Sequence, residues 1–207
     1  AIHIAHGLGR FSEDLDFDNR GLARDDFRLL VQEVSRNLIL EGFTVQTGVS
    51  FKGAFSADIK ITGLLFEAGL SGHKEEKVLV KIDTEPQNFG YSPRRVIINK
   101  FDVLAGINVV PADILLAQKF YAILNRRRAV GRDFYDAMFL AGKTRPDFGY
   151  LKAKVKIADI PALKTALLDR CAKLDFNQLA GDVAPLVFIP GDAKKIELFP
   201  EFVRGME

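Results

Sequence analysis

The segment around Asp14 and Asp16 constrains the fold more than any other part of the chain. Acidic and apolar residues alternate from Asp14 through Leu15 and Asp16 to Phe17, which is typical of a half-buried strand. Side chains two residues apart in a strand share a face, so the two carboxylates emerge together while Leu15 and Phe17 point inward. Adjacent like charges repel unless a cation compensates them. The segment therefore indicates either a solvated acidic strand end or part of a metal site.

Length and composition describe an ordinary globular chain. Of 207 residues, 48% are hydrophobic and the formal net charge is +2, which excludes disordered and fibrous classes and disfavours a large nonspecific nucleic-acid surface. The single cysteine, Cys171, excludes an intramolecular disulfide framework and a Cys-rich zinc site. No apolar run approaches the roughly 20 residues of a membrane span, and no signal peptide is recognisable. We expect a cytoplasmic protein without membrane association.

Strand and helix patterns divide the chain into two parts. In the first, apolar spacing predicts a short helix over 1–6, the acidic strand, a helix over 24–41 closed by Gly42, and strands over 43–51, 55–62, 64–68 and 76–83. Beyond Pro111 the spacing becomes helical, with helices expected up to residue 203. The pattern favours an α+β fold, with a mixed or antiparallel sheet and its helices in the first part and a mainly helical second part.

A third strand-borne carboxylate would complete an oxygen-ligand site. We favour Asp83 over Asp58 because Asp83 ends the more strongly apolar strand, over 76–83, whereas Asp58 lies inside the strand over 55–62. Spacing alone leaves the choice nearly even. If one of them meets Asp14 and Asp16 in the same sheet, the three carboxylates have the ligand type of a two-magnesium site for phosphoryl transfer. Such chemistry requires little from the protein beyond positioning and charge.

Charged residues in the helical part raise a similar choice. Lys119 lies among apolar neighbours and is either a solvated residue on an exposed face or a cation that contacts a nucleotide phosphate. Asp133 and Asp136 fall one helical turn apart, where they would cap the helix, pair with arginines, or hold a nucleotide and Lys119 in place. The run 126–128 with Arg132 is interpreted as a solvated helix end or as a guide for RNA or nucleotide phosphates.

Four segments, in order, resemble the motifs of the AbiEii-type nucleotidyltransferases. This family belongs to the DNA polymerase β superfamily and includes toxins of type IV toxin–antitoxin systems. The first and last segments are fairly specific, and together the four span most of the chain. They are Gly9-Arg-Phe-Ser-Glu-Asp-Leu-Asp-Phe17, Val80-Lys-Ile-Asp83, Ala117-Gln-Lys-Phe-Tyr-Ala-Ile-Leu-Asn-Arg126 and Gly131-Arg-Asp-Phe-Tyr-Asp136.

The resemblance implies a nucleotidyltransferase-like α+β domain followed by a helical domain. The change from strand to helix pattern places these domains over residues 1–108 and 109–207. The resemblance also implies roles for individual residues in binding two Mg²⁺ ions and an NTP. Ser12 is additionally expected to hydrogen-bond local backbone and shape its turn. The implied roles are metal binding by Asp14, Asp16 and Asp83, catalysis by these three with Lys119 and Asp133, and nucleotide binding by Arg10, Ser12, Lys119 and Asp136.

The resemblance also bears on the beginning of the chain. Family members place a Gly-Gly or Gly-Ser motif just before a helix that resembles residues 1–6, and the sequence starts immediately after that point. Backbone amides of such a turn bind phosphate at a helix N-terminus. We therefore expect an N-terminal truncation that removes this motif.

The expected function is magnesium-dependent transfer of a nucleoside monophosphate from an NTP to a hydroxyl on RNA, such as a tRNA end, or on a protein. An antitoxin protein is the expected partner of a toxin-like chain. Two alternatives stay open: a catalytically degenerate, toxin-like binding module, and a nucleotidyltransferase that modifies a small molecule such as an antibiotic. The two enzyme hypotheses share the carboxylates, so only substrate assays separate them.

Overall fold

The computed structural model describes residues 2–12 and 14–207 and divides into two compact units, which we treat separately. One, the sheet unit, comprises residues 12–88; the other, the helical unit, comprises the chain up to Phe11 together with Phe89–Glu207. This division differs from the expected boundary at 108/109, because the N-terminal segment and residues 89–108 pack with the helices. The functional domains 1–108 and 109–207 remain a prediction.

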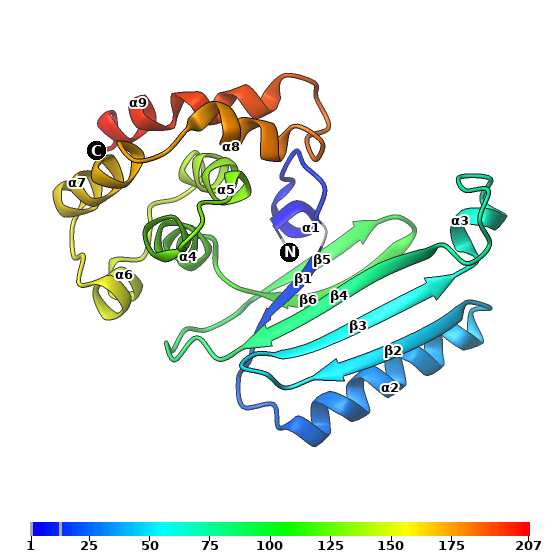
Figure 1. Cartoon of the computed structure of the whole chain (residues 1–207). Helices are drawn as coiled ribbons and strands as arrows, with labels where there is room; N and C mark the ends of the chain where they lie inside the picture. Colours follow the sequence, from blue (N-terminus) through cyan, green and yellow to red (C-terminus); the bar gives the residue numbers. More distant parts are fainter. Residues whose placement is uncertain (1, 13) are drawn as a thin grey trace. The chain divides into compact units, whose positions relative to one another are not determined.

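The sheet unit is built on a four-stranded mixed sheet with the order β1-β4-β3-β2. Strand β1 runs parallel to β4, while β4, β3 and β2 pair antiparallel (Figure 1). This order places β1 and β2 at opposite edges. The elements are β1 (Asp14–Asp18), α2 (Arg24–Leu40), β2 (Thr44–Ser50), β3 (Phe55–Thr62), α3 (Leu64–Glu67) and β4 (Lys77–Glu85).

Helix α2 covers one face of this sheet and confirms the predicted helix over 24–41 to within a residue. Asp25 and Asp26 in its first turn interact favourably with the positive end of the helix dipole. Gly42 follows the C-terminal end of the helix with a φ of 94°, which suits glycine. On its inner side Phe27 and Val31 are buried. They pack in one cluster with Ala57, Ile59, Ile61 and Ile82 of β3 and β4.

Two expectations for the sheet unit were wrong. Residues 64–68 form not a strand but the short helix α3 (Leu64–Glu67), since a brief apolar run is compatible with either structure. Leu15 and Phe17 do not lie in a buried interior: they are 36% and 56% exposed. They share the α2 side of the sheet with Ile82, but β1 is an edge strand and α2 packs on β2 and β3.

The helical unit contains a two-stranded hairpin and a set of packed helices (Figure 1). Its large buried side chains include Phe120 of α4, Phe134 of α5 and Phe199 of α9. None of the described helices is long and apolar enough to cross a bilayer. The elements are α1 (Ile2–His6), β5 (Arg94–Lys100), β6 (Val103–Val109), α4 (Ala112–Asn125), α5 (Gly131–Ala141), α6 (Phe148–Val155), α7 (Ile160–Cys171), α8 (Phe176–Val183), η1 (Asp192–Leu198) and α9 (Phe199–Arg204).

The N-terminal segment joins the helical unit through backbone pairing. Phe11 donates its N–H to the carbonyl of Leu186 at 2.8 Å, and Phe188 donates to the carbonyl of Gly9 at 3.1 Å. Arg10 forms the intervening bridge with Val187. This pairing fixes Arg10 against the helices, although its predicted motif from Ser12 onward belongs to the sheet unit.

Close packing at the start of α5 gives a testable prediction. An added Cβ on Gly131 would lie 2.1 Å from the Leu179 carbonyl oxygen and 2.8 Å from Val183 Cγ2 on α8. Gly131→Ala should therefore lower the free energy of unfolding by about 1–3 kcal/mol. Tyrosine fluorescence during urea unfolding reports on this unit, because the chain has no tryptophan and every tyrosine lies there: Tyr91, Tyr121, Tyr135 and Tyr150.

The matched control is Gly181→Ala in α8. Gly181 is exposed, and among the described residues no atom beyond its own helix surroundings lies within 4 Å of an added Cβ. Alanine there should stabilise the helix by about 0.5–1 kcal/mol. Equal unfolding midpoints for the two variants would contradict the close approach of α5 and α8.

Candidate functional site

The carboxylates of β1 and β4 lie on one face of the mixed sheet. Asp16 is the register partner of Asp83, and Asp14 is the partner of Lys81. Register partners on adjacent strands share a face at a backbone separation of about 4.8 Å. This face is opposite to the α2 side, because Ile82, between Lys81 and Asp83, packs in the α2 core. The parallel pairing of β1 with β4 thus brings Asp14, Asp16 and Asp83 to one face of the sheet, which we call the carboxylate face.

The register also separates the two candidates for the third carboxylate. Asp83 belongs to the strand next to β1 and pairs directly with Asp16. Asp58 pairs with Lys81, and Lys81 pairs with Asp14, so Asp58 lies two strands away from β1 with a lysine between. At about 4.8 Å per strand, Asp83 is nearer to the aspartate pair by one strand spacing. The geometry favours Asp83, as the sequence interpretation did.

A lysine that sequence reasoning missed lies among these carboxylates. Lys81 Nζ is 3.1 Å from Asp83 Oδ2. The hydrogen bond and charge of Asp83, with smaller effects of Asp14 and Asp58, raise the pKa of Lys81 above its usual value. The i, i+2 spacing of Lys81 and Asp83 in a strand would have placed both on one face. Sequence reasoning considered the aspartate alone.

The donor set suits a hard divalent cation. Carboxylate oxygens are the ligands that Mg²⁺ prefers, and Asp14, Asp16 and Asp83 supply them from one face. In residues 2–12 and 14–207, no three acidic, histidine or cysteine side chains are already grouped tightly enough to hold a metal ion. Asp83 instead forms an ion pair with Lys81, two residues before it on β4.

In the helical unit, a buried ion cluster forms around Asp136. This aspartate of α5 is fully buried and accepts two hydrogen bonds from Arg10, one from Nε to Oδ1 and one from Nη2 to Oδ2, both 2.7 Å long. The bidentate geometry is among the strongest that a carboxylate makes. Arg10 also donates from Nη1 to the carbonyl of Phe11. Its guanidinium is thus engaged within the protein, and its assignment to nucleotide binding stays a prediction.

Lys119 of α4 joins the same cluster because α4 packs on α5. Its Nζ lies 3.0 Å from Asp133 Oδ1 and 2.9 Å from Asp136 Oδ2, while 22% of the side chain remains exposed. Arg126 Nε lies 3.0 Å from Asp133 Oδ2, although among the described residues no donor is aligned to hydrogen-bond that oxygen. Of the roles considered for the aspartates, the structure shows pairing with arginines and contact with Lys119.

Burial and charge act against each other in this cluster. Burial disfavours the ammonium of Lys119, but the charges of Asp136 and Asp133 outweigh it and raise the pKa of Lys119 above its ordinary value. Burial likewise disfavours the Asp136 carboxylate, yet Lys119 and Arg10 hold the pKa of Asp136 below its usual range. Lys119 and Asp136 are therefore both charged at neutral pH. Three cations, Arg10, Lys119 and Arg126, face two carboxylates, which leaves an excess of positive charge.

Ser12 makes a local contact: its hydroxyl donates to the backbone oxygen of Asp14 at 3.3 Å. This hydrogen bond confirms the expected contact of Ser12 with local backbone, while its roles in shaping a turn and in nucleotide binding stay predictions.

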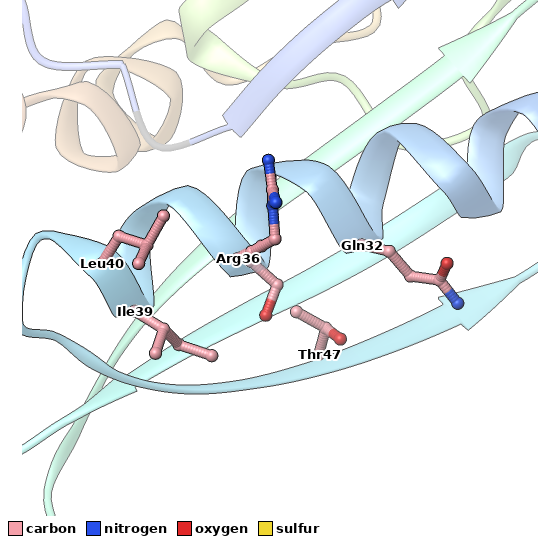
Figure 2. A pocket seen from close by; sticks show the side chains of 6 residues that line it. Gln32, Arg36, Ile39, Leu40 and Thr47 are labelled. Carbon is pink, nitrogen blue, oxygen red and sulfur yellow. The ribbon is translucent and has the colours of Figure 1, made fainter.

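A surface depression of about 280 Å³ lies elsewhere in the sheet unit, between α2 and β2 (Figure 2). Its lining includes Ile39 and Leu40 near the end of α2 and Thr47 on β2. Thr47 pairs with Ile59 and so faces the α2 side, opposite to the carboxylates. Strand β2 is also the edge farthest from β1. This depression is therefore separate from the carboxylate face.

A mixed sheet with paired aspartates on its open face, followed by helices, defines a nucleotidyltransferase-like α+β protein. The family described as Nucleotidyl transferase AbiEii toxin, Type IV TA system, matches residues 1–186, and the chain belongs to this family. Comparisons with curated proteins and with solved structures found no match. Membership confirms the resemblance read from the sequence and implies a nucleotidyltransferase toxin with an antitoxin partner.

Proposed function

We propose that the chain is a magnesium-dependent enzyme that transfers a nucleoside monophosphate from an NTP to a hydroxyl of RNA, such as a tRNA end, or of a protein. The observation that carries the proposal is the register of β1 with β4, which pairs Asp16 with Asp83 on the face that also bears Asp14. Family membership supports nucleotidyl transfer as the reaction class. A cytoplasmic location and an antitoxin partner are part of the proposal.

The three carboxylates share metal binding in the proposed reaction, and Asp83 has a second role. Mg²⁺, when bound by Asp14, Asp16 and Asp83, supplies Lewis-acid stabilisation of the charge that develops on the phosphate oxygens. Asp83 accepts the proton of the attacking hydroxyl. The new oxygen–phosphorus bond forms at the α-phosphorus, the bond to the bridging oxygen of the β-phosphate breaks, and pyrophosphate leaves.

Lys119 is the proposed contact to the NTP phosphates. Its ammonium is held by Asp133 and Asp136, and a fifth of its side chain remains exposed. The excess positive charge of its cluster favours an anionic ligand. Asp133 and Asp136 therefore act as positioning residues for Lys119, and Arg10 holds Asp136.

The test is incubation of the protein with Mg²⁺, total RNA or total protein, and each of four α-labelled NTPs. We expect label on a macromolecule with one NTP or a subset, and none after chelation of the metal. A binding module would show neither transfer nor metal-dependent affinity for NTPs in calorimetry. Label found only on small molecules would identify an antibiotic-type acceptor and contradict the proposed one.

Asparagine substitutions separate the two candidates for the third ligand. Asp83→Asn should lower the transfer rate at least about 100-fold, because both a ligand and the proposed proton acceptor are lost. Asp58→Asn should leave the rate nearly unchanged, since Asp58 lies beyond Lys81. The measurement is initial rates at saturating Mg²⁺. The reverse order of effects would move the third ligand to Asp58.

A further inference from the structure

Lys81 occupies the central register position of the carboxylate face. It lies on β4 between Asp14 of β1 and Asp58 of β3, and two residues before Asp83 on its own strand. Its neighbours on this face are therefore acidic on both adjacent strands and, on its own strand, in the direction of Asp83. No other described lysine has this surrounding in the sheet register.

The ion pair that Lys81 makes is easily exchanged. Nζ is 3.1 Å from Asp83 Oδ2, and the two side chains are 44% and 28% exposed. Ion pairs with this exposure contribute little net stability, because solvent screens them and both side chains lose freedom. A divalent cation carries twice the charge of an ammonium and accepts several carboxylate oxygens at once. It is therefore able to displace Lys81 from Asp83.

We propose that Lys81 is the counter-charge of the carboxylate face. Its ammonium pairs with Asp83 when no divalent cation is bound, and it weakens the binding of that cation. The inference rests on the proposed function, because it takes Asp14, Asp16 and Asp83 as the metal ligands. Cation binding requires Asp83 to leave Lys81, and the ammonium then stays near the bound ion and repels it. Lys81 is thus a positioning residue that sets the divalent-cation concentration at which the site fills.

The proposal predicts that removing the ammonium tightens cation binding. One unit charge within several ångströms of a divalent ion, at the high effective dielectric of an exposed face, changes its affinity about 10-fold. Lys81→Met and Lys81→Gln should therefore bind Mn²⁺, the spectroscopic probe, about 10-fold more tightly than the unmodified protein. Lys81→Arg keeps the charge and should bind as the unmodified protein does.

The experiment is titration of the full chain with Mn²⁺, without nucleotide, followed by the electron paramagnetic resonance signal of the free ion. The matched control is Lys77→Met: Lys77 lies on the same strand and face, four residues upstream, and its Nζ donates to Gln46. This control should leave Mn²⁺ affinity unchanged. Asp16→Asn reports on the metal assignment itself and should lose binding. Thermal unfolding of each variant shows that the fold is retained.

The outcomes distinguish the inference from the function on which it rests. Tighter binding by Lys81→Met and Lys81→Gln, but not by Lys81→Arg or Lys77→Met, supports the counter-charge. If Asp16→Asn loses binding while both neutral variants match the unmodified protein, the inference on Lys81 is wrong and the metal site stands. Unchanged binding by Asp16→Asn, or no binding by any of the proteins, contradicts the proposed metal site.

Discussion

Asparagine in place of Asp16 is expected to lower magnesium-dependent nucleotidyl transfer at least about 1000-fold, which corresponds to roughly 4 kcal/mol of transition-state stabilisation. Asp16 is the register partner of Asp83, so the two carboxylates lie beside each other on adjacent strands. Asparagine keeps the shape of the side chain but removes the negative charge that a divalent cation requires. The loss should therefore fall on catalysis.

Stability should be unaffected by this substitution, because Asp16 is exposed and relief of like-charge repulsion offsets any lost contact. The matched control is Asp26→Asn, which neutralises an exposed aspartate on α2, opposite to the carboxylate face. It should retain full activity. Initial rates of label transfer and thermal unfolding are measured for both variants. A rate within tenfold of the unmodified protein for Asp16→Asn would rule out this aspartate as an essential metal ligand.

Asparagine in place of Asp136 should mainly lower the free energy of unfolding. The substitution leaves Arg10, itself nearly fully buried, and Lys119 without their shared carboxylate. Breaking a buried ion pair from one side costs about 3–5 kcal/mol, because the remaining charge is desolvated without compensation. Urea unfolding followed by tyrosine fluorescence measures this loss in the helical unit. Glu201→Gln, which breaks the exposed pair of Glu201 with Arg204 in the same unit, should cost at most about 0.5 kcal/mol.

A loss below about 1 kcal/mol for Asp136→Asn would show that the cluster contributes little to the fold, contrary to its burial.

The shifted pKa values of Asp136 and Lys119 make the contribution of the cluster to stability depend on pH. The pKa of Asp136 is lowered from 3.8, so its contribution is present above that pH and is lost as pH falls through the folded-state pKa. The pKa of Lys119 is raised from 10.5, so its contribution is present below that pH and is lost as pH rises through the folded-state pKa.

Stability from the cluster should therefore be constant between about pH 5 and pH 9, and should decline as the pH falls below 3.8 and as it rises above 10.5. In Asp136→Asn the acid decline should be smaller, since the group responsible for it is gone. Unfolding midpoints from pH 3 to pH 11 for the two proteins test this. Parallel acid declines would assign the acid sensitivity to other carboxylates.

Local patterns in the sequence predicted the regular elements where the chain follows simple periodicity. Strand β3 has its predicted bounds, and α2 differs from its prediction by one residue. The hairpin of β5 and β6 was not expected, because its turn is Phe101-Asp102, both with positive φ, in place of the glycine or asparagine that usually marks such a turn. Short or unusual signals were therefore the ones that local reasoning missed.

Pairings between distant residues were beyond local patterns. The bond from Arg10 to Asp136 spans 126 residues, and no spacing rule connects them. The parallel register that sets Asp16 beside Asp83 depends likewise on strand order, which hydrophobic alternation does not specify. Residue types suggested which carboxylates carry chemistry, but the neighbours that tune them, such as Lys81, become visible only once the strands are paired.

The central claim is that the carboxylate face catalyses transfer of a nucleotidyl group, and the position of the label tests it most directly. The protein and its Asp16→Asn variant are incubated with Mg²⁺, acceptor and an NTP labelled at either the α- or the γ-phosphate. We predict that the α-label appears on the acceptor, that the γ-label appears only in pyrophosphate, and that Asp16→Asn abolishes both. Transfer of the γ-label to the acceptor, or α-label transfer that survives the substitution undiminished, would contradict the account.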